Sequence, residues 1–441
     1  MSTPAEFLKK LNDISPSLCL AKWHDLNLWV NTGRVASCCK TPQSKVSVEE
    51  LKQTLNTFNN STLKQQERAE ILNGVKPLGC EYCWQAETSQ SPENSMRVQY
   101  SKYLYETHYA NTALTYEGLL ANSASAPVRS LTLSFDALCN FECVYCGPNQ
   151  SSSWAASIAK HGPVISSDAH HKYQTTAKLV RLNLAIDPYK NPYFRLFMEW
   201  WQATGQYEVK EVLVAGGEPL MSPSFWKFVE SLENTDISIR VTTNLGASPT
   251  QLQQLLKLAE RNPRVQLDVS MESVEHQAEY IRYGVSWDQW CRNVETVLDS
   301  GTIKTVNFIS TIQALAICRY ADFLEWVEQI KIKHPSCKIT VSPSYLEEPS
   351  FMRVSILPKH LIAPAIAQLS KAIQTSTVLT ESSRAKLAVV LHRAQQSTFT
   401  RDAGRDFYNF FSTLDKRRNT SFVETFPELA QWYNSLNDNQ T

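Results

Sequence analysis

Short apolar runs alternate with longer amphipathic stretches along the middle of the chain. The apolar runs predict six β-strands, and amphipathic stretches such as residues 222–232 and 249–259 predict the helices between them. This alternation is typical of parallel β/α units. The predicted strands lie at residues 130–135, 210–215, 237–243, 264–271, 303–312 and 338–343. We therefore expect an α/β fold whose core is a partial (β/α)6 TIM-like barrel, open where a barrel of eight strands would close.

The two ends of the chain differ from this central pattern. Before the barrel, residues 26–30 and 34–38 predict a short hairpin, and Ser47 followed by Glu50 predicts the start of a helix. A polar connector at residues 111–127 should separate this part from the barrel. After the barrel, helices are predicted at residues 358–373, 380–396, 404–416 and 427–436. The predicted segments are residues 1–120, 128–350 and 351–441.

The composition is that of an ordinary soluble protein. Of the 441 residues, 43% are apolar and 20% are charged, and 43 basic residues balance 43 acidic ones. Without a basic tract, a nucleic-acid duplex has no electrostatic support as a partner. No apolar run approaches the roughly 18 residues of a membrane span, and the N-terminus has no signal-peptide core. We expect a cytoplasmic protein, whose eleven cysteines are ligands or buried thiols rather than disulfides.

Three of the cysteines form a tight group directly after the first predicted strand of the barrel. They follow the spacing Cys139-x3-Cys143-x2-Cys146. Thiols this close together in a reducing compartment indicate a metal or iron–sulfur site. Because a [4Fe–4S] cluster normally takes four thiolates, three would leave one iron open for a small molecule. The spacing alone also fits zinc or an ordinary ferredoxin-type site.

A second motif, Gly216-Gly217-Glu218-Pro219, ends the next predicted strand. Together with the cysteine spacing, which has the aromatic Tyr145 between its last two cysteines, this turn resembles the radical S-adenosylmethionine (SAM) superfamily. The resemblance implies the same (β/α)6 core, a [4Fe–4S] cluster on the three cysteines, and bound SAM. It also implies an enzyme that cleaves SAM reductively to a 5′-deoxyadenosyl radical, which abstracts hydrogen from a substrate.

The resemblance implies a role for each part of these motifs in binding SAM. Tyr145 lies where the family holds adenine. Gly216 and Gly217 permit a close backbone approach, and exposed polar groups of the turn, which continues through Glu218 and Pro219, accept the methionine ammonium. A plain strand-to-helix turn is the simpler interpretation of the tetrapeptide taken alone.

Polar residues at the ends of the next two strands complete the implied SAM site. Thr243 follows the third strand, and Ser270 and Glu272 follow the fourth. Their hydroxyls and carboxylate are implied to bind the methionine carboxylate and the ribose. Hydroxyls in such places also often cap the following helix. No catalytic residue is predicted beyond the cluster ligands.

A second group of cysteines lies before the barrel. Cys19, Cys38, Cys80 and Cys83 offer four thiolates, including a Cys-x2-Cys knuckle, and such a set fits either zinc or a [4Fe–4S] cluster. The pieces resemble the auxiliary-cluster module of SPASM and twitch radical SAM proteins. The set of four cysteines is the shorter, twitch-like one, and it implies one auxiliary cluster. The module here precedes the core instead of following it, and Cys39 is a substitute candidate for Cys38.

These features predict a radical SAM enzyme acting on an unidentified substrate, a peptide or a small molecule such as a sugar. A peptide is preferred because auxiliary-cluster members often act on ribosomal peptides. The expected partner is a reducing electron donor such as flavodoxin or ferredoxin. The alternative is a non-catalytic, zinc-stabilised binding protein, which explains the cysteines but not the Gly-Gly-Glu-Pro turn. Arg97, in a Ser-x-Arg motif after the knuckle, either positions an anionic group or forms a structural ion pair.

Overall fold

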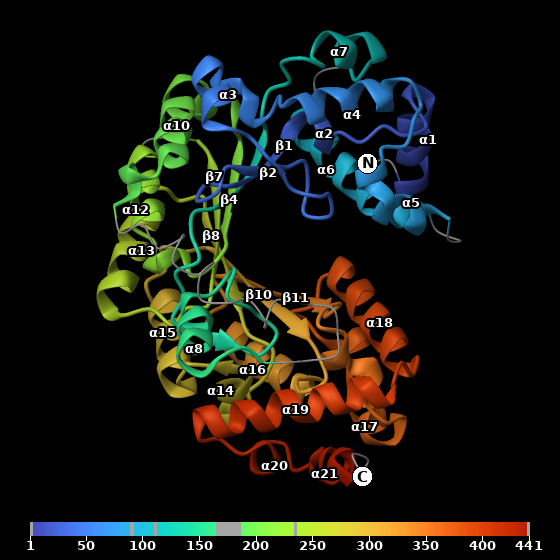
Figure 1. Ribbon diagram of the computed structural model, residues 1–441, viewed down its shortest axis with the longest axis vertical. Coiled ribbons are helices and arrows are strands. Elements are labelled where there is room, and N and C mark those ends of the chain that lie inside the picture. Colours follow the sequence, from blue (N-terminus) through green and yellow to red (C-terminus); the bar gives the residue numbers. More distant parts are fainter. Residues whose placement is uncertain (1–2, 89–91, 110–112, 165–186, 233–235, 439–441) are drawn as a thin grey trace. The chain divides into compact units, whose positions relative to one another are not determined.

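The computed structural model describes residues 3–88, 92–109, 113–164, 187–232 and 236–438 (Figure 1). Its contacts divide the chain into two compact units. The first unit comprises Met1–Asp136, Ala185–Ala215 and Pro223–Arg240, and the second comprises Ala137–Leu184, Gly216–Ser222 and Val241–Thr441. The three segments expected from the sequence stay a prediction.

Among its described residues, the first unit contains five complete strands and the beginning of a sixth. Their order is β6 (Glu211–Ala215), β4 (Ser130–Ser134), β1 (Asp25–Trp29), β2 (Arg34–Ala36) and β3 (Ser44–Lys45). β4 runs parallel to both β6 and β1, whereas β1, β2 and β3 pair antiparallel. The predicted hairpin is therefore present as β1 and β2. Its first strand also pairs with β4, with Leu26 opposite Leu131, and this pairing was not predicted.

In the second unit, β10 runs parallel to both of its neighbours in the main sheet. β7 (Ser238–Thr243) ends there and is followed in the sheet by β8 (Val265–Ser270), β10 (Thr305–Ile312) and β11 (Lys338–Tyr345). Along β10, buried and half-buried side chains alternate, because one face packs under helices. Phe308 on that face contacts Trp290 and Trp326, with ring centroids 6.0 and 5.7 Å apart. All six predicted barrel strands exist, and the mostly parallel sheet fits a partial TIM-like barrel.

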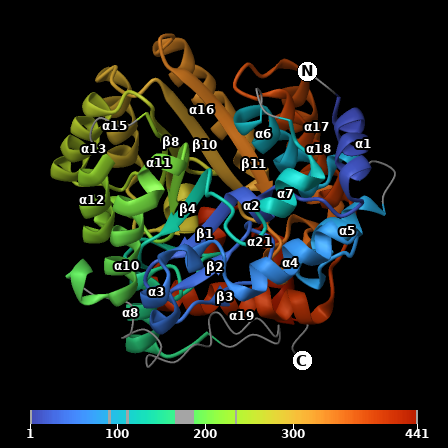
Figure 2. The ribbon, with the colours of Figure 1, turned by 90° about the horizontal axis from the view of Figure 1, so that it is seen from above.

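Helices lie between the strands of the second unit. α13 (Pro249–Arg261) and α15 (Trp287–Asp299) lie side by side near β8, as Figure 2 shows, and α16 (Tyr320–Lys333) leads to β11. α13 begins with a capping box between Ser248 and Gln251 and with a proline in its first turn. In the first unit, the helix start predicted at Ser47 is confirmed, because Ser47 and Glu50 form the same kind of box at α3 (Val48–Gln53).

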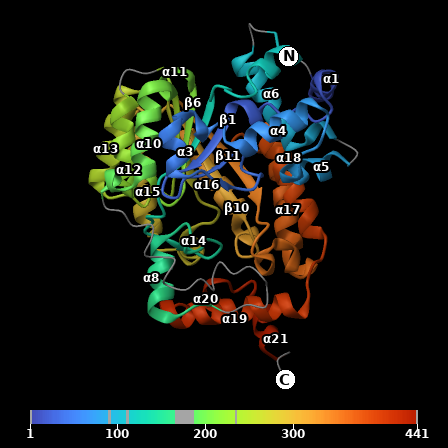
Figure 3. The ribbon, with the colours of Figure 1, turned by 45° about the horizontal axis from the view of Figure 1, so that its top comes forward.

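The end of the chain is helical, as predicted, but the predicted start of its last helix was wrong. α17 (Lys359–Thr375) and α18 (Glu381–Gln395) lie side by side (Figure 3), followed by α19 (Arg401–Arg418), α20 (Phe422–Thr425) and α21 (Ala430–Asp438). Pro427 does not begin the last helix, because the chain first makes a turn in which the Leu429 amide donates to the Phe426 carbonyl at 2.9 Å. The connector 111–127 is not wholly irregular either, since Thr115 caps α7 (Tyr116–Ala121).

Candidate functional site

The loop that carries Cys139, Cys143 and Cys146 lies in the second unit, between the sheet and α8 (Ser152–His161). Its centre is a two-residue strand, β5 (Glu142–Cys143), which pairs antiparallel with β9 (Arg282–Tyr283). This register sets Cys143 opposite Arg282. A residue far along the sequence thus lies directly beside the central cysteine.

Hydroxyl groups at the start of α8 bind the carbonyl groups of the cysteine loop. Ser151 donates to the Phe141 carbonyl at 2.6 Å and also caps the helix. Ser152 and Ser153 both donate to the Cys139 carbonyl, at 3.1 and 2.8 Å. These hydrogen bonds from the start of α8 hold the backbone of the cysteine loop in place, and they do so without a bound ligand.

Gly217 lets the Gly-Gly-Glu-Pro turn lie directly against the cysteine loop. A Cβ atom at Gly217 would lie 2.3 Å from the Leu138 carbonyl oxygen, which is backbone and has little freedom to move. The next amide, that of Glu218, donates to the same oxygen at 2.6 Å. Gly216 has a φ of 125°, a value that favours glycine. The sequence motif is therefore required by contact between two backbones, in addition to any approach to SAM.

Two further glycines also lie against the loop, Gly246 against a side chain and Gly284 against its backbone. A Cβ atom at Gly246 would lie 2.4 Å from the Phe141 ring, and one at Gly284 would lie 2.7 Å from the Asn140 carbonyl oxygen. Gly284 also has a φ of 108°, a left-handed value that favours glycine. Sequence analysis did not single out either residue, because an isolated glycine carries no sign of what it touches.

Two of the three thiols have an N–H donor beside them. The Asn244 side-chain amide lies 3.7 Å from the Cys139 sulfur, and the Arg282 guanidinium lies 3.9 Å from the Cys143 sulfur. Burial raises the pKa of Cys139 to about 12 and raises the pKa of Cys143 further. Such thiols lose their protons readily only when a metal or a cation compensates the charge. The donor set of soft sulfur atoms with N–H groups beside them fits an iron–sulfur cluster.

A buried ion pair supports the Arg282 side chain. Its guanidinium contacts the Glu272 carboxylate at 2.5 and 3.1 Å, and the Tyr145 hydroxyl donates to the same carboxylate at 3.0 Å. Glu272 is 1% exposed. Burial opposes the charge of Arg282, but Glu272 and Tyr145 hold its pKa above the ordinary value. Two residues predicted to bind SAM, Tyr145 and Glu272, are thus bonded directly to each other, and Arg282, which sequence analysis missed, binds the same carboxylate.

Glu218 joins the turn to the end of β7. Its carboxylate accepts hydrogen bonds from the Thr243 hydroxyl at 2.7 Å, the Asn244 amide at 2.6 Å and the Leu220 amide at 3.1 Å. Burial raises the pKa of Glu218 to about 7, although these hydrogen bonds work in the opposite direction. The Glu218 and Thr243 side chains therefore already bind each other within the protein.

The other two predicted SAM-binding residues lie nearby in the second unit. Pro219 is buried and begins a 3-10 turn, Pro219–Met221. Ser270 is the last residue of β8 and is half-buried. The roles of these residues and of Tyr145, Gly216, Gly217, Glu218, Thr243 and Glu272 in binding SAM stay predictions.

The four cysteines of the first unit line one pocket. Cys19 precedes α2 (Ala21–His24), Cys38 follows β2, Cys80 ends a 3-10 turn and Cys83 lies in α5 (Glu81–Glu87). Cys80 and Cys83 are 9% and 8% exposed. Cys39, beside Cys38, is exposed to solvent. The four cysteines thus share one cavity although they lie far apart in the sequence. Only the resemblance to auxiliary-cluster proteins grouped them beforehand.

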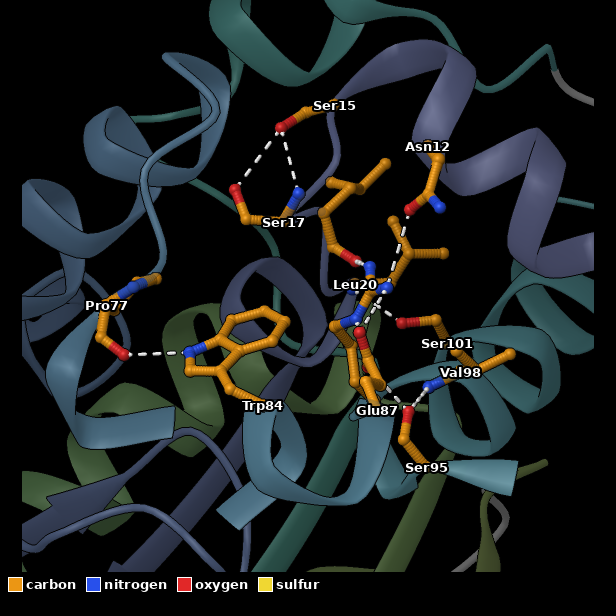
Figure 4. Close-up of polar contacts among 12 residues, drawn as sticks. Asn12, Ser15, Ser17, Leu20, Pro77, Trp84, Glu87, Ser95, Val98 and Ser101 are labelled. Carbon is orange, nitrogen blue, oxygen red and sulfur yellow. Dashed lines mark hydrogen bonds and ion pairs between the residues drawn. The ribbon is translucent and has the colours of Figure 1, made fainter. Parts of the chain in front are cut away.

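Side-chain contacts build the wall of this pocket (Figure 4). The Trp84 indole donates to the Pro77 carbonyl at 3.1 Å, and Ser95 donates to Glu87 at 2.7 Å. Arg97 pairs with Glu87 at 2.7 and 3.0 Å and donates to the Leu18 carbonyl at 2.8 Å. Of the two roles considered for Arg97, the structural ion pair is therefore the one observed.

Charged groups line the same pocket. Lys22, Lys40 and Arg97 belong to its wall together with the cysteines. Burial raises the pKa of Cys80 to about 11 and that of Cys19 and Cys83 to about 12. Among the residues that the structure describes, no three His, Cys, Asp or Glu side chains are grouped as around a single metal ion. The soft donors with cations beside them fit an anionic, sulfur-ligated group.

The family comparison identifies the class of protein. Residues 134–327, which contain the cysteine loop and the Gly-Gly-Glu-Pro turn, match the model of the radical SAM superfamily. These residues therefore form a radical SAM domain, and this domain indicates an enzyme whose substrate is unidentified. The family implies a [4Fe–4S] cluster and SAM as cofactors.

Known structures resemble the chain only distantly. Streptococcus suis SuiB bound to SAM matches with 12% identity and a TM-score of 0.38, covering 83% of this chain and 72% of SuiB. Archaeal TYW1 matches with 15% identity and a TM-score of 0.25, covering 43% and 63%. TYW1 with a lysine–pyruvate adduct matches with 16% identity and a TM-score of 0.29, covering 58% and 76%. No curated protein sequence matches the chain.

Within the described part of the chain, no helix has both the length and the apolar character needed to span a membrane.

Proposed function

We propose that Cys139, Cys143 and Cys146 hold the [4Fe–4S] cluster of this radical SAM enzyme and leave one iron open to SAM. With both cofactors bound, the site supplies the 5′-deoxyadenosyl radical that abstracts hydrogen from the substrate. The protein's own contribution is to fix the loop and its charge. Three glycines admit close neighbours, and N–H groups of Asn244 and Arg282 lie beside two thiols, where they favour thiolate.

We propose that SAM binds at the residues that the family motifs imply. Tyr145, Gly216, Pro219 and Ser270 are proposed to contact it. Gly217, Glu218, Thr243 and Glu272 are proposed to shape its site, because each is engaged with protein atoms: the Leu138 backbone, Thr243, Glu218 and Arg282, respectively. Of the residues that shape the site, Glu218, Thr243 and Glu272 are buried, and they would keep water from that side of the ligand.

We further propose a twitch-type auxiliary [4Fe–4S] cluster in the pocket of the first unit. The observation that carries this proposal is that Cys19, Cys38, Cys80 and Cys83 line a single pocket. Four thiolates fill the complement of such a cluster, so no iron is left open. Its role is then electron transfer or support of a wall that faces the substrate.

Anaerobic purification and reconstitution test both clusters. We expect about eight irons per chain. Cys139→Ala, Cys143→Ala or Cys146→Ala should each abolish 5′-deoxyadenosine production and leave about four irons. Removing Cys80 and Cys83 together should also leave about four, while SAM cleavage uncoupled from substrate partly survives. A colourless wild-type protein containing zinc would instead support the binding-protein alternative.

Adjacent cysteines provide a matched pair of variants for the auxiliary site. Cys38 lines the pocket, whereas Cys39 is exposed. Cys38→Ser should lower the iron content, and Cys39→Ser should leave it unchanged. The opposite result would transfer the ligand assignment to Cys39.

We propose a peptide as the substrate, a cytoplasmic location, and flavodoxin or ferredoxin as the electron donor. The peptide follows from the resemblance to auxiliary-cluster proteins, which often act on ribosomal peptides. A short precursor-peptide gene beside this one would supply the probe, and incubation with SAM and reductant should change the mass of that peptide. An unchanged peptide, together with a sugar that stimulates SAM cleavage, would favour the small-molecule alternative.

A further inference from the structure

Lys22 is a buried cation at the cysteine pocket. It lies in α2, three residues after Cys19, and its side chain is 2% exposed. It lines the pocket together with all four cysteines. A lysine is rarely this buried without a counter-charge or a set of acceptors. Its surroundings therefore indicate what the pocket is built to hold.

The protein partners of Lys22 are incomplete. Its ammonium lies 2.5 Å from the Glu67 carboxylate, a close ion pair. Apart from this carboxylate, the ammonium has no hydrogen-bond acceptor among the described residues. An ammonium carries three donors. A buried group with unused donors at a thiol-lined cavity calls for a negatively charged acceptor there.

We propose that Lys22 is a positioning residue of the auxiliary site, whose ammonium offsets the negative charge of the four thiolates and of the group they hold. This inference rests on the proposed auxiliary cluster. Reduction adds one negative charge to such a group, and a nearby fixed cation stabilises the reduced form more than the oxidised form. Lys22 should therefore raise the reduction potential of the auxiliary cluster, and Glu67, which carries the opposite charge, should lower it.

Substitutions of the two partners test the inference by the sign of their effects. The experiment uses the reconstituted full-length protein and follows each cluster by its electron paramagnetic resonance signal during a redox titration. Lys22→Met should shift the midpoint potential of the auxiliary cluster downward, and Glu67→Gln should shift it upward. Lys22→Arg, which keeps the charge, should lie closer to wild type. The potential of the cluster on the Cys139 loop should not move.

Lys64 provides a control for the loss of a buried lysine. It is also 2% exposed and lies in the first unit, but its ammonium donates to the Asp25 carbonyl at 2.9 Å and to Asn59. Lys64→Met should lower the stability of the unit without shifting either potential. If the Lys22→Met protein does not retain the auxiliary cluster, its midpoint potential cannot be measured. The potential of the Glu67→Gln protein then tests the inference, because that variant keeps Lys22.

The outcomes separate this inference from the function on which it rests. A wild-type protein that binds only one cluster overturns the auxiliary-cluster proposal and the role of Lys22 with it. Two clusters whose potentials do not respond to Lys22→Met or Glu67→Gln overturn the role of Lys22 alone. Shifts of the same sign in both variants also overturn it, because a charge effect must reverse with the charge.

Discussion

The two cysteine sites of this protein are held in place by different means. On the Cys139 loop, the three cysteines lie within eight residues, and backbone atoms of neighbouring turns contact the loop at glycine positions. In the first unit, the four cysteines come from separate places between Cys19 and Cys83, and side chains such as Arg97 join those places. The first site depends on close backbone packing, and the second depends on buried polar side chains.

This difference determines how each site should fail. A side chain added at a glycine that contacts the loop backbone forces the loop to move, because a backbone carbonyl group cannot rotate away as a side chain can. A lost side-chain contact instead leaves buried charges without partners. The Cys139 loop should therefore be sensitive to small increases in volume, and the pocket should be sensitive to loss of charge.

Gly217→Ala should have the largest effect and breaks the backbone contact of the Cys139 loop. The new Cβ atom would lie 2.3 Å from the Leu138 carbonyl oxygen and 2.8 Å from the Ala137 carbonyl carbon. Displacement of this loop should remove its cluster, so iron should fall from about eight to about four per chain and SAM cleavage should be lost. Iron analysis and a 5′-deoxyadenosine assay measure both.

Gly118→Ala is the control for the added methyl group. Gly118 lies in α7, and its nearest neighbour for a Cβ atom is the Thr115 hydroxyl at 3.2 Å. Alanine there should change stability by less than about 1 kcal/mol. If Gly217→Ala weakened SAM binding but kept all of the iron, the glycine would serve the ligand and not the loop.

Arg97→Met should have the next largest effect and breaks the side-chain wall of the pocket. Arg97 is 2% exposed, and its loss leaves Glu87 with an uncompensated, largely buried charge. Breaking such a pair costs about 3–5 kcal/mol. Chemical denaturation followed by tryptophan fluorescence measures this cost, and the auxiliary iron should fall while SAM cleavage persists.

The Arg405–Asp402 pair is the surface control for this prediction. Its side chains are 48% and 70% exposed, so Arg405→Met should cost less than about 1 kcal/mol. Equal effects of the two substitutions would contradict the importance of the pocket wall.

The same difference explains what could be predicted from the sequence. The strands and the Cys139 loop were predictable because their signals are local: apolar periodicity, cysteine spacing and a glycine turn within a few residues. Arg282 was missed because only the pairing of β5 with β9 brings it beside Cys143. The parallel pairing of β1 with β4 was missed for a similar reason, since a short apolar strand does not specify its second neighbour. The pocket was predicted only by resemblance, and its cation Lys22 carries no sequence signal.

Acid should weaken the first unit through His24. This residue is 5% exposed. Its neutral ring donates to the Pro127 carbonyl at 3.1 Å and accepts from the Tyr109 hydroxyl, so both ring nitrogens are hydrogen-bonded. Burial lowers the pKa of His24 to about 3. Below the ordinary value of 6.5 the unfolded state binds a proton that the folded state does not. Stability contributed by the neutral ring should therefore fall as the pH falls, by about 1.4 kcal/mol per pH unit.

Unfolding free energies measured between pH 6.5 and pH 5 test this dependence. His24→Gln, which retains a donor and an acceptor, should reduce the slope. His276→Gln removes a histidine whose side chain is 92% exposed and serves as the control. An unchanged slope in His24→Gln would mean that acid acts on another group.

Ser153→Ala should have the smallest effect and measures one hydroxyl contact of the Cys139 loop. Ser153 donates to the Cys139 carbonyl at 2.8 Å, and Ser152 donates to the same oxygen. Because the carbonyl keeps one donor, the loss should cost only about 1 kcal/mol of unfolding free energy. The iron content should remain at the wild-type value, since Gly217 and Gly284 still admit the same backbone neighbours. A variant that lost the cluster would show that the hydroxyls of α8, rather than the close backbone contacts, hold this loop in place.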